Sequence, residues 1–314
     1  MSIDARDIRI VSVNVSELKG TIKKPVSEIH LNRYGVEGDA HAGKWHRQVS
    51  LLAHESVEKF SQQAGRQIAN GEFAENITTE GMLLYQASPL DRFFCADVEL
   101  EVTQIGKKCH GDNCAIYREV GNCVMPKEGI FCRVLSPGDL QAGDVLEYIP
   151  KVYSALVITL SDRAYEGEYA DLSGPRLSEI LREYFKKQKW LHDIENVVIP
   201  DNEQALSALL LDAVEQGTDF IFTTGGTGIG PRDITPEVVR SVIRKEIPGI
   251  MEMIRMKYGA EKPNALLSRS VAGTADKTII FSLPGSVKAV NEYMEEITRS
   301  LRHMLYMVHG LELH

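Results

Sequence analysis

The pattern of apolar and polar residues changes its period about halfway along the chain. In the first half, apolar residues alternate with polar ones over short runs; Val98, Leu100 and Val102, for example, alternate with glutamates. This period of two is typical of half-buried strands. The runs predicted as strands are Ile8–Val15, Gln48–Ala53, Val98–Ile105, Gly129–Leu135 and Asp144–Ile149. With one predicted helix at His54–Gln63, they favour a mostly β fold, either barrel-like or a sandwich.

After Pro150, short apolar runs alternate with segments in which apolar residues recur every three or four positions. The predicted strands are Val152–Leu160, Asp193–Ile199 and Asp219–Thr224, and the predicted helices are Pro175–Phe185, Asn202–Gln216, Pro236–Arg244 and Ser286–Val308. This alternation indicates a three-layer α/β fold, in which a mostly parallel sheet carries helices on both faces. The change of period predicts two domains, residues 1–150 and 151–314.

A glycine-rich segment follows the third predicted strand of the second half. It reads TTGGTGIGPRDITPE over residues 223–237. Glycine lets the backbone approach a ligand closely, and backbone N–H groups at such a turn bind phosphate. The segment has neither the Gly-Lys-Ser/Thr of a P-loop nor the GxGxxG of a dinucleotide fold. Asp233 beside a phosphate is unfavourable unless a cation bridges them, and Mg²⁺ is the usual bridge. A tight turn that binds nothing is the alternative.

Three other loops of this half carry polar residues where a strand ends. They contain Ser161-Asp162-Arg163, Pro200-Asp201 and Pro284-Gly285-Ser286. Because ligands of open α/β sheets bind at the carboxyl ends of the strands, we expect all these loops to meet at one edge of the sheet. Asp162, Asp201 and Asp233 would then surround the phosphate. The alternative is that Asp201 and Ser286 only cap helices and that Asp162 is a turn residue.

These segments of the second half resemble molybdopterin adenylyltransferases, over roughly residues 153–308. The resemblance implies transfer of an adenylyl group from Mg·ATP to the terminal phosphate of molybdopterin, with Asp201 and Asp233 serving catalysis and Mg²⁺. Arg163, Arg232 and Lys288 are candidates for stabilising the leaving pyrophosphate. The residues implied to bind substrate or nucleotide are Ser161, Asp162, Thr224, Gly225, Gly226, Thr227, Gly228, Glu246, Pro284, Gly285 and Ser286.

The first half resembles a MOSC domain, through residues 34–43, 47–50 and 71–77. This family implies a barrel-like fold that binds molybdenum cofactor or carries sulfur for it. The resemblance makes Cys123 the candidate sulfur carrier or cofactor ligand and Arg47 and Asn76 the candidate cofactor contacts. Basic residues near Cys123 would lower the pKa of its thiol, and the alternative is a small buried cysteine. These basic residues are Lys107, Lys108, Arg118 and Lys127.

Other polar residues of the first half remain open. His41 and His46 with Asp39 are possible metal ligands, but a loop held by hydrogen bonds is favoured. Cys109 and Cys114 are additional thiols to which the sequence assigns no function. The five cysteines are an odd number without a CxxC pair, which disfavours both a disulfide framework and a structural zinc site.

Charge and hydropathy exclude some partners. The chain has 35 Lys and Arg against 44 Asp and Glu, a formal charge of −9, and neither half has the basic character of a nucleic-acid-binding protein. No apolar run approaches the ~20 residues of a membrane span. The N-terminus lacks a secretory signal, so we expect a cytoplasmic protein with no membrane partner.

The sequence therefore predicts a two-domain enzyme of molybdenum-cofactor biosynthesis. Its ligands would be ATP, Mg²⁺, molybdopterin and the finished cofactor, and its partners the molybdenum insertase and molybdoenzymes. The resemblance also implies a homo-oligomer, a trimer or larger. Two alternatives remain: a non-catalytic carrier or chaperone of the cofactor, and a MOSC half that acts as a molybdenum-dependent reductase of N-hydroxylated compounds.

Overall fold

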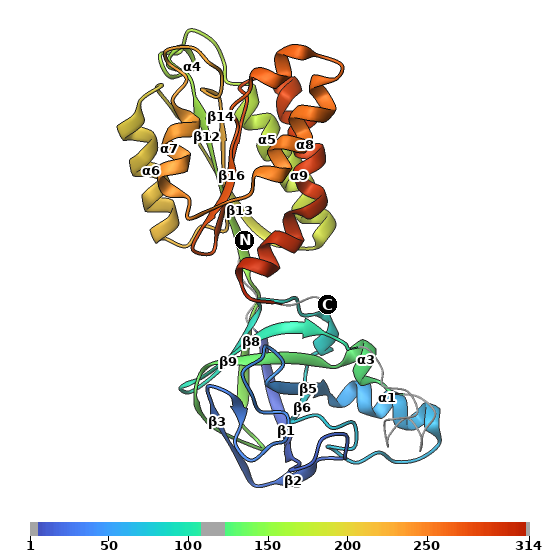
Figure 1. Cartoon of the computed structure of the whole chain (residues 1–314). Helices are drawn as coiled ribbons and strands as arrows, with labels where there is room; N and C mark the ends of the chain where they lie inside the picture. The colour runs from blue at the N-terminus through green and yellow to red at the C-terminus, as the bar shows by residue number, and fades with distance from the viewer. Residues whose placement is uncertain (1–5, 108–122, 312–314) are drawn as a thin grey trace. The chain divides into compact units, whose positions relative to one another are not determined.

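The computed structural model describes residues 6–107 and 123–311. The chain divides into two compact units, Met1–Lys151 and Val152–His314 (Figure 1). Cys109, Cys114, Lys108 and Arg118 lie outside the described residues. Among the described helices, none is both long and apolar enough to cross a membrane.

The N-terminal unit is a closed barrel of seven strands. Its order is β11-β7-β8-β9-β5-β6-β1, and antiparallel pairing of β1 with β11 closes the ring. The barrel strands are β1 (Arg6–Val15), β5 (Val49–Ala53), β6 (Ile77–Glu80), β7 (Arg92–Cys95), β8 (Val98–Ile105), β9 (Ile130–Ser136) and β11 (Val145–Ile149). A short β2 (Lys24–Val26) adds to the edge of β1. The barrel-like prediction is thus confirmed, and the sandwich alternative is wrong.

Smaller elements complete this unit. β3 (Glu28–Asn32), β4 (Gly35–Val36) and β10 (Gly138–Gln141) form a separate three-stranded sheet. The helical elements are α1 (His54–Ala64), η1 (Leu84–Gln86) and α3 (Met125–Glu128). The main core contains the inward-facing residues of the barrel strands, and a smaller core that includes Val57, Phe60 and Phe73 packs beneath α1.

The C-terminal unit is built on a six-stranded sheet of order β13-β12-β14-β17-β16-β15. The strands are β12 (Val152–Leu160), β13 (Leu191–Ile199), β14 (Phe220–Thr224), β15 (Lys245–Glu246), β16 (Ala272–Ala275) and β17 (Thr278–Leu283). The first four strands in this order run parallel to one another. β16 pairs antiparallel with β17, and β15 pairs antiparallel with β16. The predicted mostly parallel sheet is confirmed.

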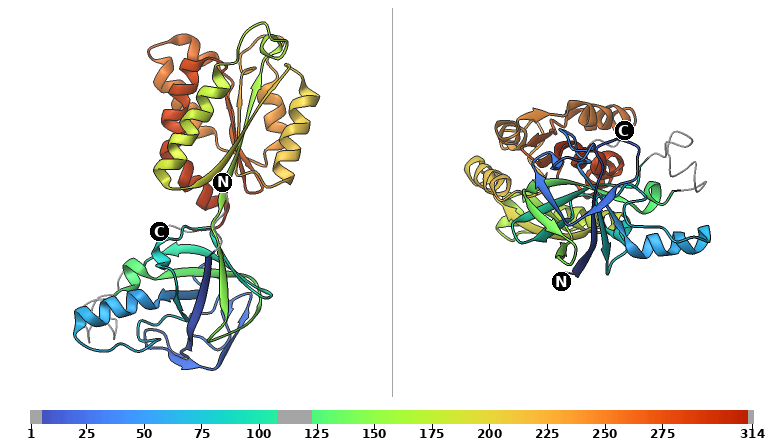
Figure 2. Two further views of the ribbon diagram at one scale, coloured as in Figure 1. Left: turned by 180° about the vertical axis from the view of Figure 1, so that it is seen from behind. Right: turned by 90° about the horizontal axis from the view of Figure 1, so that it is seen from below.

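Helices cover both faces of this sheet. The helical elements are α4 (Asp162–Tyr165), α5 (Ser173–Gln188), α6 (Glu203–Glu215), α7 (Thr235–Val242), α8 (Pro248–Gly259), η3 (Pro263–Leu267) and α9 (Val287–Val308). Figures 1 and 2 show α6 and α7 on one face and α5, α8 and α9 on the other. The apolar stripe of α9 is core, since Val290, Met294 and Leu301 are fully buried.

The strand register places the predicted polar loops together. Leu160 of β12 pairs with Ile199 of β13, and Thr159 pairs with Thr224 of β14. Thr224 in turn pairs with Leu283 of β17. All four parallel strands therefore end in the same row, and the loops that follow them begin at one edge of the sheet.

Candidate active site

Two aspartates hold the loops after β12 and β13 against each other. The amide of Asp162 donates to Oδ2 of Asp201 at 3.3 Å, and the amide of Asp201 donates to Oδ1 of Asp162 at 3.0 Å. Asp162 also forms an ion pair with Arg232 from the glycine-rich segment. Asn202, not Asp201, caps α6 by accepting a hydrogen bond from the amide of Ala205 at 2.9 Å. The capping interpretation of Asp201 is therefore wrong.

Serines cap two other helices that begin at this edge, α4 and α9. The hydroxyl of Ser161 accepts from the amide of Ala164 at 3.3 Å and caps the short α4. That of Ser286 accepts from the amide of Ala289 at 3.2 Å and caps α9. Ser286 therefore has the capping role proposed as its alternative, while it also lines the pocket described below.

Close packing requires glycine at positions 225, 226 and 285. Gly225 and Gly226 have φ values of 102° and 62°, which disfavour residues with a side chain. A Cβ at Gly225 would lie 2.3 Å from the carbonyl oxygen of Leu160, and one at Gly285 would lie 3.2 Å from Cα of Gly225. The Thr224 hydroxyl donates to the Pro284 carbonyl at 3.1 Å. The loops after β14 and β17 thus pack backbone to backbone.

The side chain of Asp233 bonds to the glycine loop, residues 225–230. Its Oδ2 accepts a hydrogen bond from the amide of Gly230 at 2.7 Å, and a Cβ at Gly228 would lie 2.8 Å from the same oxygen. Arg269 holds this turn from outside by donating to the carbonyls of Gly228 at 2.6 Å and Asp233 at 2.7 Å. Arg269 was not predicted from the sequence, because it lies far along the chain in a segment without a recognisable motif.

The carboxylates at this edge influence one another's ionisation. The pKa of Asp201 is raised, chiefly by burial and further by the negative charges of Asp162 and Asp233, while the Asp162 amide and Arg232 oppose the shift. Carboxylate oxygens are ligands that suit a hard cation such as Mg²⁺. In the described part of the chain, no three His, Cys, Asp or Glu residues are already arranged around a metal position. Mg²⁺ would then need substrate oxygens as further ligands, as it commonly does.

A pocket of about 470 Å³ opens beside the glycine loop. One wall comes from Gly225–Gly228 and Pro284–Ser286, and Asp233 lines the same space. The opposite wall comes from α8, η3 and the first turns of α9. Asp162 and Asp201 are not among its described lining residues, so Asp233 connects the pocket to the carboxylate cluster.

Glu246, which the resemblance implied to bind substrate or nucleotide, is not among the described residues that line this pocket. It lies on the edge strand β15, where it is exposed and forms an ion pair with Arg240 at 3.7 Å.

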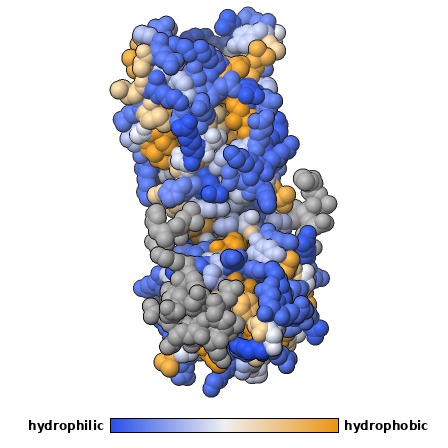
Figure 3. All heavy atoms as spheres, turned by 90° about the vertical axis from the view of Figure 1, so that its right-hand side faces the viewer, coloured by the Kyte–Doolittle hydropathy of each residue, from blue (hydrophilic) through white to orange (hydrophobic). Residues whose placement is uncertain are grey.

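On the face of the C-terminal unit seen in Figure 3, apolar side chains interrupt the polar surface. The exposed apolar residues of α8 and η3 are Met253, Met256, Leu266 and Leu267.

The N-terminal unit has a smaller, more enclosed pocket of about 90 Å³. Arg47 and Lys107 bring positive charge to it, and Nε of Arg47 is buried without a hydrogen-bond partner among the described residues. The guanidinium of Arg47 lies 4.7 Å from the ring centre of Trp45. The lining residues are His41, Trp45, Arg47, Ser50, Ala74, Asn76, Lys107, Met125 and Phe131. The predicted contacts Arg47 and Asn76 therefore share one cationic pocket.

Buried hydrogen bonds form the wall behind this pocket. Asn76 accepts from the Ser50 amide at 3.1 Å and donates to the Asn14 carbonyl at 3.2 Å. Asp39 accepts from the buried ammonium of Lys23 at 2.5 Å and from the His41 amide at 2.9 Å. Asp39 thus holds a loop by hydrogen bonds, as favoured over a metal site.

Cys123 is half-buried beside this pocket. It packs against the small core to which Met125 and Phe131 belong, and both of these line the pocket. Burial raises the pKa of Cys95 and, more strongly, that of the fully buried Cys132. Those two thiols are therefore poor sources of thiolate.

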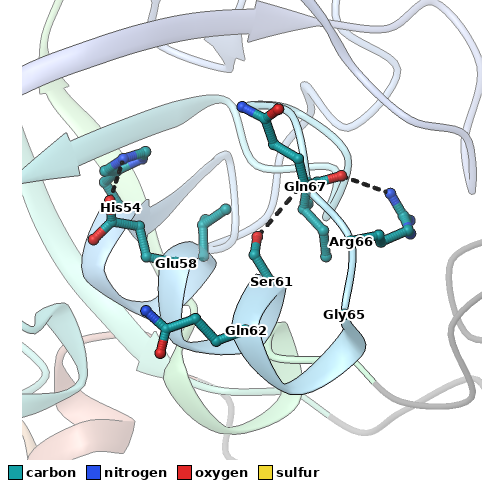
Figure 4. Close-up of a pocket in the computed structure, with 9 residues that line it drawn as sticks. His54, Glu58, Ser61, Gln62, Gly65, Arg66 and Gln67 are labelled. Atoms are coloured by element: carbon teal, nitrogen blue, oxygen red, sulfur yellow. Dashed lines mark hydrogen bonds and ion pairs between the residues drawn. The ribbon is translucent and has the colours of Figure 1, made fainter.

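A third hollow, of about 510 Å³, lies along α1 and the turn that follows it (Figure 4). Its polar groups pair mainly with their neighbours: His54 with Glu58 at 3.5 Å, and Ser61 with the amide of Ile68 at 3.2 Å. None of the residues predicted to be functional is among the described residues that line it.

Comparison with known proteins places both units. The family model "Probable molybdopterin binding domain" matches residues 156–303, and the MOSC domain model matches residues 38–147. The molybdopterin adenylyltransferase of Helicobacter pylori (strain J99) is 36% identical over 154 residues, which cover 49% of this chain and 86% of that protein. The enzyme of that name from Pyrococcus furiosus is 36% identical over 161 residues, 50% of this chain and 91% of that protein.

A relative whose name describes it as bifunctional is also similar. The "Molybdenum cofactor biosynthesis bifunctional protein" of Synechococcus elongatus is 32% identical over 163 residues, 50% of this chain and 48% of that protein. The family models identify the α/β unit as a probable molybdopterin binding domain and the barrel as part of a MOSC domain. The chain belongs to the molybdopterin adenylyltransferases, which are nucleotidyltransferases, and carries a MOSC domain ahead of that unit.

Proposed function

We propose that the C-terminal unit transfers the adenylyl group of Mg·ATP to the terminal phosphate of molybdopterin and releases pyrophosphate. The observation that carries this proposal is the meeting of Asp201, Asp233 and the glycine loop at one edge of the sheet, beside a pocket large enough for a pterin. Phosphoryl-type transfer depends on positioning and charge neutralisation more than on covalent chemistry, and this edge offers both.

The residues at the carboxyl ends of the parallel strands would have different roles in this transfer. The amide of Gly225 donates to the carbonyl of Leu283 at 3.0 Å, so the backbone amides of Gly226–Gly228 are the ones that would bind the phosphate of the pterin. Asp162 positions Asp201 through their exchange of hydrogen bonds. Asp201 and Asp233 are the residues that would hold Mg²⁺, which neutralises the phosphate charge when bound. Arg232 forms an ion pair with Asp162 and acts on the charge of Asp201. Its guanidinium would stabilise the negative charge of the leaving pyrophosphate.

We propose that the N-terminal unit binds molybdenum cofactor, or carries sulfur for it, in the pocket of Arg47 and Lys107. The unpartnered Nε of Arg47 and the adjacent ammonium suit an anionic group, and Cys123 lies next to the pocket wall. Fusion of the units raises the effective concentration of one unit's product at the other. The exposed apolar residues of α8 and η3 support assembly into a homo-oligomer, and the molybdenum insertase and molybdoenzymes are the proposed partners.

Mass spectrometry of ligands and products of the full chain tests both adenylyl transfer by the C-terminal unit and cofactor binding by the N-terminal unit. Incubation with ATP and molybdopterin should yield adenylylated molybdopterin and pyrophosphate in equal amounts. Purified protein should also carry a pterin cofactor that the Arg47→Met variant retains less well. Binding of molybdopterin without any adenylylated product would instead favour the non-catalytic carrier.

A further inference from the structure

Different residues hold the two parts of the glycine-rich segment. In its first part, the hydroxyl of Thr235 donates to the carbonyl of Gly225 at 2.8 Å, and the amide of Thr235 donates to the carbonyl of Gly226 at 3.1 Å. Thr235 is fully buried where α7 begins. The glycines that begin the loop are therefore fixed from the interior of the unit.

The second part, residues 228–233, is mostly exposed. Ile229 is 72% exposed, and residues 230–232 are exposed as well. The conformation of this turn therefore depends on hydrogen bonds more than on apolar burial. Within the turn, the amide of Gly230 donates to Oδ2 of Asp233 at 2.7 Å, and the amide of Asp233 donates to the carbonyl of Gly230 at 3.1 Å.

The side chain of Arg269 bridges the two ends of this turn. Its Nε donates to the carbonyl of Gly228 at 2.6 Å, and Nη2 donates to the carbonyl of Asp233 at 2.7 Å. The ion pair between Arg232 and Asp162 also attaches the turn to the unit. The side chain of Arg232 is 65% exposed, however, so that pair contributes little. The Arg269 bridge is thus the stronger attachment of the turn that carries Asp233.

A guanidinium group suits this bridge. Its donors lie in a planar fork, whereas a lysine ammonium is a compact charge that cannot reproduce the fork. Glu237 of α7 forms an ion pair with Nη1 of Arg269, which orients the fork and balances its charge. Arg269 is not among the described residues that line the pocket, so its effect on a ligand there would be indirect.

We propose that Arg269 is a positioning residue for Asp233, separate from the contacts that fix the phosphate-binding glycines. The proposal rests on the adenylylation function proposed above. Thr235 holds Gly225 and Gly226, and the backbone amide of Arg269 donates to the carbonyl of Thr227 at 2.9 Å. None of these bonds uses the Arg269 side chain. Loss of that side chain should therefore displace Asp233 and leave the phosphate-binding amides in place.

Replacement of Arg269 by lysine keeps the positive charge and removes the fork. We expect kcat for adenylylation by the full chain to fall roughly tenfold or more, because two hydrogen bonds to the turn are disturbed. The Kd of molybdopterin, measured by calorimetry, should stay within about twofold of the wild type, because the bonds to the glycines remain. Without substrates, hydrogen exchange at the amides of Gly230 and Asp233 should become faster, while the amide of Thr235 stays protected.

Two further variants separate the parts of the segment. Thr235→Val removes the hydroxyl bond to Gly225 and should weaken molybdopterin binding roughly fivefold. Arg244→Lys is the matched control, since Arg244 is paired with Asp276 at the opposite end of the sheet. It should change neither kcat nor molybdopterin binding.

Three results would overturn the proposal. One is exchange at Gly230 and Asp233 that is as slow in Arg269→Lys as in the wild type. The others are a wild-type kcat in Arg269→Lys, and a loss of molybdopterin affinity as large as the loss of kcat. If the wild type released no pyrophosphate, the adenylylation function would fail. The exchange measurement needs no turnover, so it would still decide whether Arg269 holds the turn of Asp233.

Discussion

Asp162 and Asp201 each accept a hydrogen bond from the other's backbone amide, at 3.0 and 3.3 Å. The two residues follow the neighbouring parallel strands β12 and β13. The exchange therefore ties the two loops together and fixes Asp201 close to Asp233, although burial and like charge both oppose ionisation of Asp201.

Replacement of Asp162 by alanine removes the acceptor of the Asp201 amide. We expect adenylylation to fall at least tenfold and the free energy of unfolding to fall by about 1 kcal/mol, the typical net value of one hydrogen bond. Asp162→Asn keeps an acceptor oxygen at the same place and should retain the wild-type stability. Kinetics and urea unfolding measure the two effects. Wild-type turnover in Asp162→Ala would show that the exchange does not position Asp201.

The raised pKa of Asp201 predicts a stability that depends on pH. Because the pKa is higher in the folded than in the unfolded state, the contribution of Asp201 is most favourable at acid pH and is lost as the pH rises through the folded-state pKa. Asp201→Asn should therefore be more stable than the wild type at neutral pH. It should also be inactive, because it loses a proposed Mg²⁺ ligand. The difference in melting temperature should vanish below the ordinary pKa of an aspartate. A variant less stable than the wild type at neutral pH would contradict this.

Gly225 should not tolerate a side chain. Alanine there would need a φ near 102° and would place Cβ 2.3 Å from the Leu160 carbonyl. The backbone strain alone costs roughly 1–3 kcal/mol, so Gly225→Ala should be strongly destabilised and should lose pterin binding. Gly249→Ala is the control, since Gly249 lies in α8 with open space around a Cβ. That change should be neutral or stabilising by up to about 1 kcal/mol. Equal unfolding midpoints for the two variants would rule out the steric explanation.

The buried pair of Lys23 and Asp39 should control the stability of the barrel. Both side chains are almost fully buried, so Lys23→Met leaves an unpaired buried carboxylate and should cost about 3–5 kcal/mol. Lys24→Met removes the same charge from an exposed neighbour and should change little. Hydrogen exchange of peptides from the N-terminal unit measures the difference. Equal protection in both variants would mean that the pair does not stabilise the barrel.

Local patterns were enough to predict most of the loops that meet at this edge of the sheet. Strands that end in Ser161-Asp162, Pro200-Asp201 and the glycine loop are visible in the sequence, and parallel pairing then brings their ends together. The mutual hydrogen bonds of Asp162 and Asp201 could not be predicted, because they depend on the exact register of β12 and β13. The assignment of the capping role to Asn202 depends on the same geometry.

Features made by residues distant in the chain were missed. Closure of the barrel requires β1 to pair with β11, the first and last strands of the N-terminal unit in chain order. Alternation within a strand carries no information about that pairing. Helix α8 was not predicted from the sequence, although it supplies a wall of the pocket. Arg269 and Lys262 reach the site from that region, so no motif near the glycine loop pointed to them.

The central claim is that Asp233 serves transfer of the adenylyl group at the glycine loop. The most direct measurement is pyrophosphate release from ATP and molybdopterin by the full chain, compared among the wild type, Asp233→Asn and Asp276→Asn. Asp276 is paired with Arg244 at the opposite end of the sheet, so its variant is a matched control. We expect Asp233→Asn to lose roughly a hundredfold or more of the rate, as for loss of a major electrostatic contribution to the transition state, while it still binds molybdopterin and Asp276→Asn stays active. Wild-type turnover in Asp233→Asn would contradict the account.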